Sequence, residues 1–199
     1  MQDEITIEQI EKIGNTVIYL STRVGELART KLLKLLFLIE EKSIKDFGKP
    51  FFGLDFKVWQ FGPVVEPVYN EITDGQMHIF KDYFKKNLFD EFEAVKEFND
   101  DEFSNNDILL LEKMVAFSRH KIAKDFVRIT HAPDSLWTKT AKKYGVYEAL
   151  EHGDLTKTDH SIEFSLLFES DKESYLLEKY NAYLENSLFS KNFKVLMSV

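Results

Sequence analysis

The sequence contains no cysteine, only four prolines and eight glycines, and no long apolar run. The absence of cysteine excludes disulfide bonds, thiol catalysis and thiolate metal sites. The low proline and glycine content excludes collagen-like and linker-like chains. The longest uninterrupted apolar stretch, Leu35 to Ile39, has five residues and is far too short to cross a bilayer, so no membrane contact is expected.

An excess of basic residues is also missing, since the formal net charge is −8 and the isoelectric point is about 5.2. A protein that binds nucleic acid broadly is expected to be basic, so general phosphate binding is disfavoured. The first residues, Met1 to Glu4, are acidic and do not resemble the basic start of a signal peptide. We therefore expect a cytoplasmic protein.

What the sequence does contain is an ordinary globular mixture, with 44% apolar and 30% charged residues over 199 positions. This length suits one domain, or one domain with an extension. Aromatic residues are abundant, with 18 phenylalanines, eight tyrosines and two tryptophans. Most of these rings are expected in a large core, and the alternative is an interface at which some of them anchor a partner.

The spacing of apolar residues predicts a first helix over 6–20, capped by Thr6 with Gln9 three positions later. A second helix is predicted from Thr30 to Gly48. This second helix is apolar on most sides, so we expect it to lie at the centre of the fold with neighbours around most of its circumference.

Polar residues in the central helix are predicted to face solvent. Its last turns, Glu40 to Asp46, become polar and are expected to leave the core. Lys31 and Lys34 lie three residues apart on one helical face. A solvent-exposed stripe with buried stems is the favoured interpretation of this pair, and contact with an acidic partner is the alternative.

Short strands complete the predicted fold. Leu54, Phe56 and Val58 alternate with other residues, which is typical of a strand. Gly62-Pro63 is predicted to begin the next helix, because proline at the first helical position leaves no N–H unpaired. Looser alternation over 92–98 favours a further strand. The fold class is therefore mainly α with a small antiparallel β element (α+β), in a single compact helical domain.

A recognisable order of motifs runs through these elements. It consists of a helix rich in lysine and leucine, an aromatic strand leading into Gly-Pro-Val, a Val-Tyr pair, and a late Thr-His followed by tryptophan. In this sequence these are Thr30–Leu38, Phe56, Trp59, Phe61–Val64, Val68-Tyr69, Thr130-His131 and Trp137. In this order the chain resembles the Panacea domain, the SocA-like antitoxin family that is also met as phage-associated proteins. The resemblance covers about residues 5 to 145.

The resemblance implies a cytoplasmic, non-enzymatic antitoxin that needs no cofactor and neutralises a cognate toxin by direct protein–protein binding. The family's founding member is also an adaptor that delivers its toxin to a protease, so a protease is a second partner that the resemblance implies. We assign residues 1–150 to the Panacea-like domain and 151–199 to a C-terminal extension. The sequence leaves the toxin and the oligomeric state open.

Residues of the family pattern are expected first to have structural roles. Near a helix end, His131 is expected to hydrogen-bond carbonyl groups, and Trp137 to fill a pocket. The family-motif residues with an expected structural role are Lys31, Leu35, Trp59, Gly62, Pro63, Tyr69, His131 and Trp137.

Catalytic and metal-binding patterns are missing from the sequence. It has no Gly-x-Ser-x-Gly elbow, Walker loop or dinucleotide fingerprint. His152 and His160 stand among acidic residues, but their spacing matches no metal motif, and we expect a polar loop over 151–160. A hydrolase that uses an acidic cluster and His131 is kept as an alternative.

Charge is distributed unevenly along the chain. Residues 90–102 contain seven acidic residues against Lys96 alone, a net charge of −6, whereas residues 113–143 have a net charge of +6. The two segments either pack together or form a bipolar surface that steers a charged toxin. On the second view, toxin contact is expected at Asp100, Asp101 and Glu102. An alternative function is a nucleic-acid-binding regulator that uses the 113–143 stretch, with Arg128, Lys139 and Lys142 as phosphate contacts.

A last amphipathic helix is predicted over about 171–188. Tyr175, Tyr180 and Tyr183 fall on or near one face of it. This helix either folds back over the domain or presents its tyrosine rings to a groove on the toxin. These three tyrosines are therefore further candidate partner-binding residues.

Overall fold

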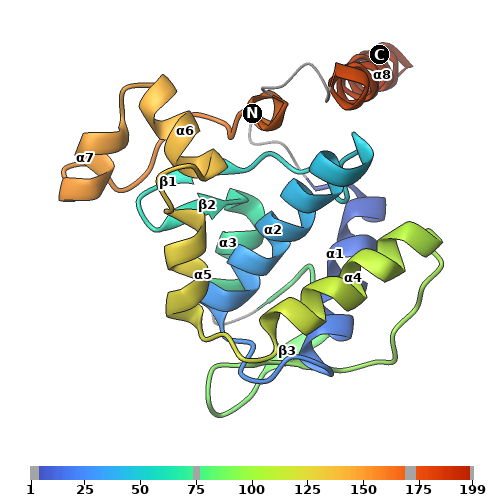
Figure 1. Ribbon diagram of the computed structural model, residues 1–199. Coiled ribbons are helices and arrows are strands. Elements are labelled where there is room, and N and C mark those ends of the chain that lie inside the picture. Colours follow the sequence, from blue (N-terminus) through green and yellow to red (C-terminus); the bar gives the residue numbers. More distant parts are fainter. Residues whose placement is uncertain (1–4, 74–76, 169–173, 198–199) are drawn as a thin grey trace.

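A computed structural model describes residues 5–73, 77–168 and 174–197, with side chains up to residue 190. Within this part the fold is mainly helical with short antiparallel strands, which confirms the predicted fold class. Helix α2 (Arg29–Phe47) runs through the middle of the molecule, and α1 (Ile7–Ser21), α4 (Asn105–Ser118) and α5 (Ala123–Thr130) surround it (Figure 1).

The ends of these helices follow local signals in the sequence. Thr6 accepts a hydrogen bond from the Gln9 amide in a capping box, as predicted for α1. Gly48 ends α2 with φ +61°, a left-handed conformation that glycine adopts without steric cost. The start of α2 was predicted at a Thr30 cap, but the helix already begins at Arg29 because Ala28 takes the extended conformation of the cap position.

The prediction that polar residues of α2 face solvent is confirmed for Lys42 and Lys45, which are exposed, and wrong for four others. Lys31, Lys34, Glu40 and Ser43 are all buried, because neighbouring elements cover almost the whole circumference of α2. These four buried polar residues are shielded from solvent, so each must find a hydrogen-bond partner inside the fold.

The prediction that Gly62-Pro63 starts a helix is also wrong. Strands β1 (Lys57–Trp59) and β2 (Gly62–Val64) form an antiparallel hairpin in which Trp59 pairs with Gly62. Gly62 has φ +96°, which closes the tight turn of this hairpin, and the next helix, α3 (Glu66–Thr73), begins only after Val65. Pro63 lacks an N–H and is tolerated in a strand at such an edge position.

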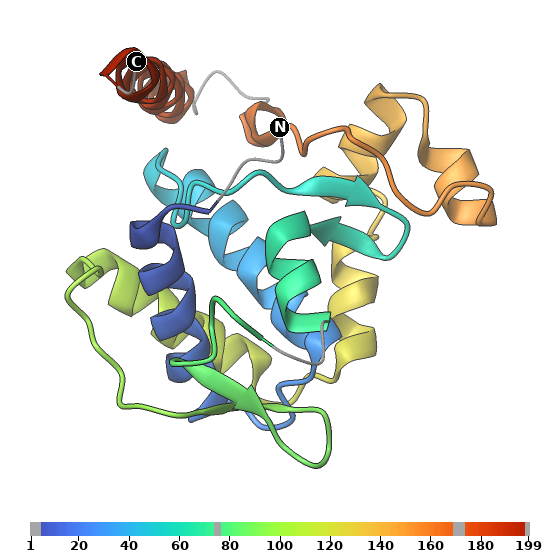
Figure 2. The ribbon, with the colours of Figure 1, turned by 180° about the vertical axis from the view of Figure 1, so that it is seen from behind.

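A second small hairpin lies between α3 and α4. It consists of β3 (Phe84–Lys86) and β4 (Phe92–Ala94), so the strand expected over 92–98 is confirmed only at its beginning. Phe84 and Phe92 are buried and their rings pack edge to face with centroids 5.4 Å apart. This hairpin lies against α1 (Figure 2).

The chain after α5 returns to the first hairpin. It forms α6 (Leu136–Lys143), α7 (Tyr147–His152) and a short 3-10 helix, η1 (Phe164–Leu167). Between α7 and η1, the segment 156–162 runs beside β1, where Val58 N donates to His160 O over 2.9 Å. The polar loop expected over 151–160 therefore includes the end of α7, and its later residues are hydrogen-bonded to β1.

The C-terminal helix α8 (Ser174–Met197) lies at the edge of the molecule near the C-terminal end of α2 (Figures 1 and 2). The first positions predicted for this helix, 171–173, lie outside the described residues. Its first half contacts the body of the fold, where Tyr180 is buried. Leu184, Leu188 and Phe189 are exposed in its second half.

Candidate partner-binding sites around the central helix

The β1–β2 hairpin is held by side chains from α2, from α6 and from the residue that follows α5. Each lies within hydrogen-bonding distance of a main-chain carbonyl group of the hairpin. The pairs are Trp137 Nε1 with Trp59 O at 3.0 Å, His131 Nε2 with Gln60 O at 3.0 Å, and Lys34 Nζ with Pro63 O at 3.2 Å. His131 and Trp137, the late residues of the family pattern, therefore contact the hairpin that contains its aromatic strand. The hairpin lies more than 70 residues earlier in the chain.

Other residues of the family pattern lie close to this hairpin or in the core. Tyr69 is half-buried and packs edge to face against Trp59, with ring centroids 5.1 Å apart. Leu35 is fully buried in α2. Lys31 Nζ donates to Gly25 O over 2.6 Å, and burial lowers the pKa of this ammonium, with Glu26 and Glu91 opposing the shift.

Glu40 binds the turn that precedes β1. Four consecutive main-chain N–H groups donate to its two carboxylate oxygens. Oε2 accepts from Phe51 at 2.8 Å and Phe52 at 2.7 Å, and Oε1 accepts from Gly53 at 3.0 Å and Leu54 at 3.3 Å. Burial raises the pKa of Glu40 to about 7, and the four N–H groups oppose this rise by stabilising the anion.

Two further helices cover the same turn. From α1, Gln9 Nε2 donates to Gly53 O over 2.8 Å and to Phe52 O over 3.2 Å. From α8, the Tyr183 hydroxyl lies so close to Gly53 that a Cβ at this position would stand 2.5 Å from it. Burial, followed by the charge of Glu40, raises the pKa of Tyr183. Residues 51–54 therefore join α1, α2 and α8.

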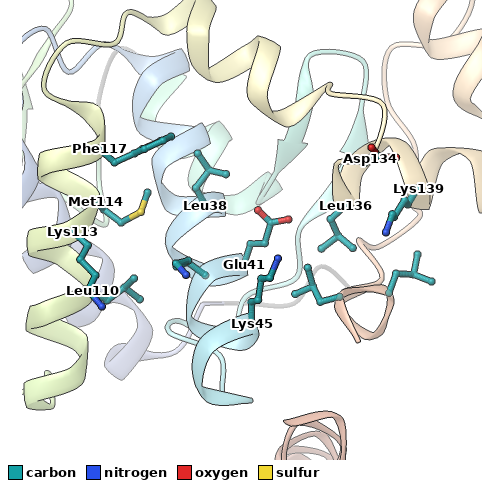
Figure 3. Close-up of a pocket in the computed structure, with 13 residues that line it drawn as sticks. Leu38, Glu41, Lys45, Leu110, Lys113, Met114, Phe117, Asp134, Leu136 and Lys139 are labelled. Carbon is teal, nitrogen blue, oxygen red and sulfur yellow. The ribbon is translucent and has the colours of Figure 1, made fainter. Parts of the chain in front are cut away.

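A groove of about 490 Å³ opens between α2, α4, α6 and η1 (Figure 3). Apolar side chains form most of its surface, and ionisable side chains stand among them. The apolar residues are Leu38, Leu110, Met114, Phe117, Leu136, Leu166 and Leu167, and the ionisable ones are Lys42, Lys45, Lys113, Lys139, Glu41 and Asp134. Four lysines against two acids give this groove a positive charge, in contrast to the negative chain as a whole.

Glu41 lies within the groove beside Lys45 (Figure 3). Burial raises the pKa of Glu41 to about 7, while the charge of Lys45 opposes the rise. Because the ordinary value is 4.5, the folded protein holds this proton to a higher pH than the unfolded chain. The stability that this proton contributes is fully present below pH 4.5 and is lost as the pH rises through 7.

Glu41→Gln is therefore expected to flatten the loss of stability between about pH 4.5 and pH 7. The free energy of unfolding of both proteins should be measured by urea denaturation at several pH values across this window. Burial raises the pKa of Glu40 as well, but Glu40 is present in both the wild-type protein and the variant. The difference between their two stability curves therefore reports the titration of Glu41 alone. Parallel curves would contradict the shift that burial gives to Glu41.

The acidic residues singled out in the sequence lie away from this groove. Asp100, Asp101 and Glu102 are exposed in the loop before α4, where Asp101 N donates to the Asn99 side chain over 2.8 Å. Nearby acids bind other partners, since Asp90 pairs with Lys86. A toxin contact at these three positions stays a prediction.

The C-terminal tyrosines do not share one environment. Tyr175 is exposed, Tyr183 is half-buried over the 51–54 turn, and Tyr180 is buried. Tyr180 faces Phe168, with ring centroids 6.2 Å apart. The part of α8 that carries Tyr180 and Tyr183 therefore folds back on the domain, and toxin binding by these tyrosines also stays a prediction.

The basic stretch 113–143 is spread over α4, α5 and α6. Arg128 pairs with Asp125 over 3.1 Å, Lys142 Nζ lies 5.1 Å from the ring centroid of Tyr147, and Lys139 lies in the groove. The three residues suggested as phosphate contacts therefore lie in three different local environments.

The β3–β4 turn presents a second apolar surface. Leu88 and Phe89 at its tip are 101% and 81% exposed. Asn87 fixes the shape of the tip, because its side-chain oxygen accepts from Phe89 N over 2.8 Å and from Glu91 N over 3.1 Å. These two exposed apolar side chains make the β3–β4 turn an alternative place for partner contact.

Sequence reasoning missed Glu40 and the groove lysines Lys42 and Lys45. The buried position of Glu40 has a signal in the sequence, since a helix that is apolar on most sides leaves little room for an exposed polar residue. The groove needs α2, α4, α6 and η1 together, and nothing in the local sequence predicts their arrangement. Across the described ranges, no cluster of three histidine or acidic side chains is placed to hold a metal ion.

Comparison with known protein families gives a match over the middle of the chain. The family model described as "Antitoxin SocA-like, Panacea domain" matches residues 32–138. The match extends from α2 to α6 and includes the β1–β2 hairpin, Glu40 and much of the groove. No curated protein and no solved structure matches the chain. None of the helices in the described part combines the length and the apolar character that a membrane span needs.

Proposed function

Since the chain belongs to the SocA-like antitoxin family with the Panacea domain, we propose that it neutralises a cognate toxin in the cytoplasm by binding it directly. The groove between α2, α4, α6 and η1 is the observation that carries this proposal. It has the apolar floor and the charged margin that receive an amphipathic helix of a partner protein. Its volume of about 490 Å³ accommodates a few large apolar side chains.

The charges of the groove define the chemistry of the toxin segment. Lys113 on α4 and Lys139 on α6 stand on opposite sides of the groove, and Lys45 on α2 lies between them (Figure 3). A helix with one apolar face and acidic flanks complements this arrangement. Opposite charges at the margin of an interface mainly accelerate association, and they disfavour partners of the wrong sign.

The proposal is tested with the open reading frame adjacent to this gene. Expressed alone, its product is expected to stop growth, and co-expression of this protein is expected to restore it. The double substitution Lys45→Glu and Lys113→Glu is expected to weaken toxin binding about tenfold or more and to abolish rescue. Lys85→Glu is the matched control, because Lys85 is an exposed lysine of β3 outside the groove.

Three results would change this proposal. An adjacent product that is harmless alone, with no binding to this protein, would contradict the antitoxin role. Full rescue by the groove variant, with loss of rescue after Leu88→Ser and Phe89→Ser, would move the toxin contact to the β3–β4 turn. Toxin that disappears in rescued cells, but persists in protease-deficient cells, would support the protease adaptor role that the family resemblance implies.

A further inference from the structure

A second pocket, of about 330 Å³, opens at the other end of α2 from the groove. The first turns of α2, the β1–β2 hairpin, α3 and the segment after α7 form its walls. Its lining residues are Arg29, Thr30, Leu33, Lys34, Trp59, Phe61, Val64, Tyr69, Thr156 and Lys157. The pocket thus uses residues of the family pattern that the proposed toxin contact does not use.

The polar groups of this pocket are almost all hydrogen-bond donors. Arg29, Lys34 and Lys157 supply three basic side chains, and Thr30 and Thr156 add two hydroxyl groups. Among the described residues that line the pocket there is no carboxylate. Arg29 also influences Asp90, a carboxylate that does not line the pocket. The pKa of Asp90 is lowered first by its hydrogen bond and ion pair with Lys86, and then by the charge of Arg29. This composition is suited to an anion that accepts several hydrogen bonds.

Lys34 is the buried member of this set. Its side chain is 2% exposed, and Nζ donates to Pro63 O over 3.2 Å. An ammonium group has three N–H donors, so the carbonyl oxygen occupies one of them. Burial without a neighbouring carboxylate lowers the pKa of Lys34 to about 7. A bound anion would supply the missing countercharge and would favour the protonated amine.

Aromatic rings form the rest of the pocket. Lys157 Nζ lies 4.1 Å from the ring centroid of Trp59, and Trp59 in turn packs against Tyr69. Phe61 is 71% exposed on the turn of the β1–β2 hairpin. An exposed ring and a half-buried ring beside basic side chains provide a surface on which a flat heterocycle can stack.

We propose that this pocket binds a small phosphorylated compound with a flat ring, of the class of the nucleoside monophosphates. The phosphate is held by Lys34, Arg29 and Lys157, and the ring packs against Phe61 and Tyr69. A phosphate dianion matches three basic groups better than a carboxylate with a single charge. The pocket volume is at the lower end of ligand sites and suits a mononucleotide. The chain's net charge of −8 opposes binding of a long nucleic acid.

The test is a titration of the full-length protein with AMP, GMP, CMP and UMP. Binding is detected by calorimetry and by changes in the NMR signals of the two tryptophan side chains. At least one nucleotide is expected to bind with a Kd below about 1 mM. Adenosine and inorganic phosphate are expected to bind at least about tenfold more weakly than the best nucleotide, because each lacks one half of the ligand.

Substitutions then locate the binding site. Lys34→Met and Lys157→Ala are each expected to weaken binding about tenfold or more, and Lys85→Met, the control, to leave it unchanged. Lys157 is exposed, so its replacement tests the pocket even if the buried Lys34 variant unfolds. Failure of all four nucleotides to bind, or binding that neither substitution weakens, would overturn the proposal. Binding of an oligonucleotide alone would overturn it as well. Toxin rescue is measured separately, so neither result depends on the other.

Discussion

At pH 8, above the pKa of about 7 that burial gives to Glu40, replacing Glu40 by glutamine is expected to lower the free energy of unfolding by about 3 to 5 kcal/mol. The carboxylate accepts from four consecutive N–H groups of residues 51–54. A glutamine side chain keeps the size of glutamate but replaces one acceptor oxygen by an NH₂ group, which is a donor. Two of the four buried N–H groups then face another donor and lose their partner.

The neighbouring substitution Glu41→Gln is the control for this experiment. Glu41 lies in the groove without such a set of amide donors, and removal of its charge is expected to leave stability unchanged or slightly higher at pH 8. Both variants should be measured by urea denaturation at the same pH. A loss below about 1 kcal/mol for Glu40→Gln would show that the 51–54 turn holds its shape without the carboxylate.

Truncation of Trp137 to alanine is expected to cost about 3 to 5 kcal/mol of folding stability. The side chain is fully buried, and its indole N–H donates to Trp59 O over 3.0 Å. The substitution therefore removes a large buried ring and leaves a carbonyl of the β1–β2 hairpin without its donor. Trp137→Phe keeps most of the packing and is expected to cost about 1 to 3 kcal/mol, since the hydrogen bond is lost.

Phe61→Ala serves as the matched control for the tryptophan variants. It also removes an aromatic ring near the hairpin, but that ring is 71% exposed, so the expected change in stability is within about 0.5 kcal/mol. Thermal and urea denaturation of the three variants should give the order Trp137→Ala, Trp137→Phe, Phe61→Ala. Equal losses for the two Trp137 variants would show that the indole hydrogen bond, rather than ring volume, dominates.

Those parts of the fold that depend on local sequence were predictable. The Thr6 capping box and the Gly48 end of α2 are decided by residues within four positions of one another. The central place of α2 also followed from its own sequence, because leucines on most sides require neighbours on most sides.

Features that depend on distant residues were not predictable in the same way. The local sequence of Gly62-Pro63 is compatible with a helix start and with a hairpin. The choice depends on pairing with β1 and on side chains that contact the hairpin carbonyls from α2, from α6 and from His131 after α5. Strand β3 has three residues, two of them lysines, so it carries almost no pattern of its own. The positions of Lys34 and Glu40 required the hairpin and the 51–54 turn, which the sequence of α2 does not contain.

The segment 156–162 beside β1 has a consequence for synthesis on the ribosome. The Thr158 hydroxyl donates to Val58 O over 2.7 Å across 100 positions of the chain. At roughly 5–20 residues per second, β1 waits on the order of 5–20 s for this neighbour to be translated. During that interval its outer edge is open to pairing with other nascent chains. The short length of β1, three residues, limits this hazard while the polypeptide grows.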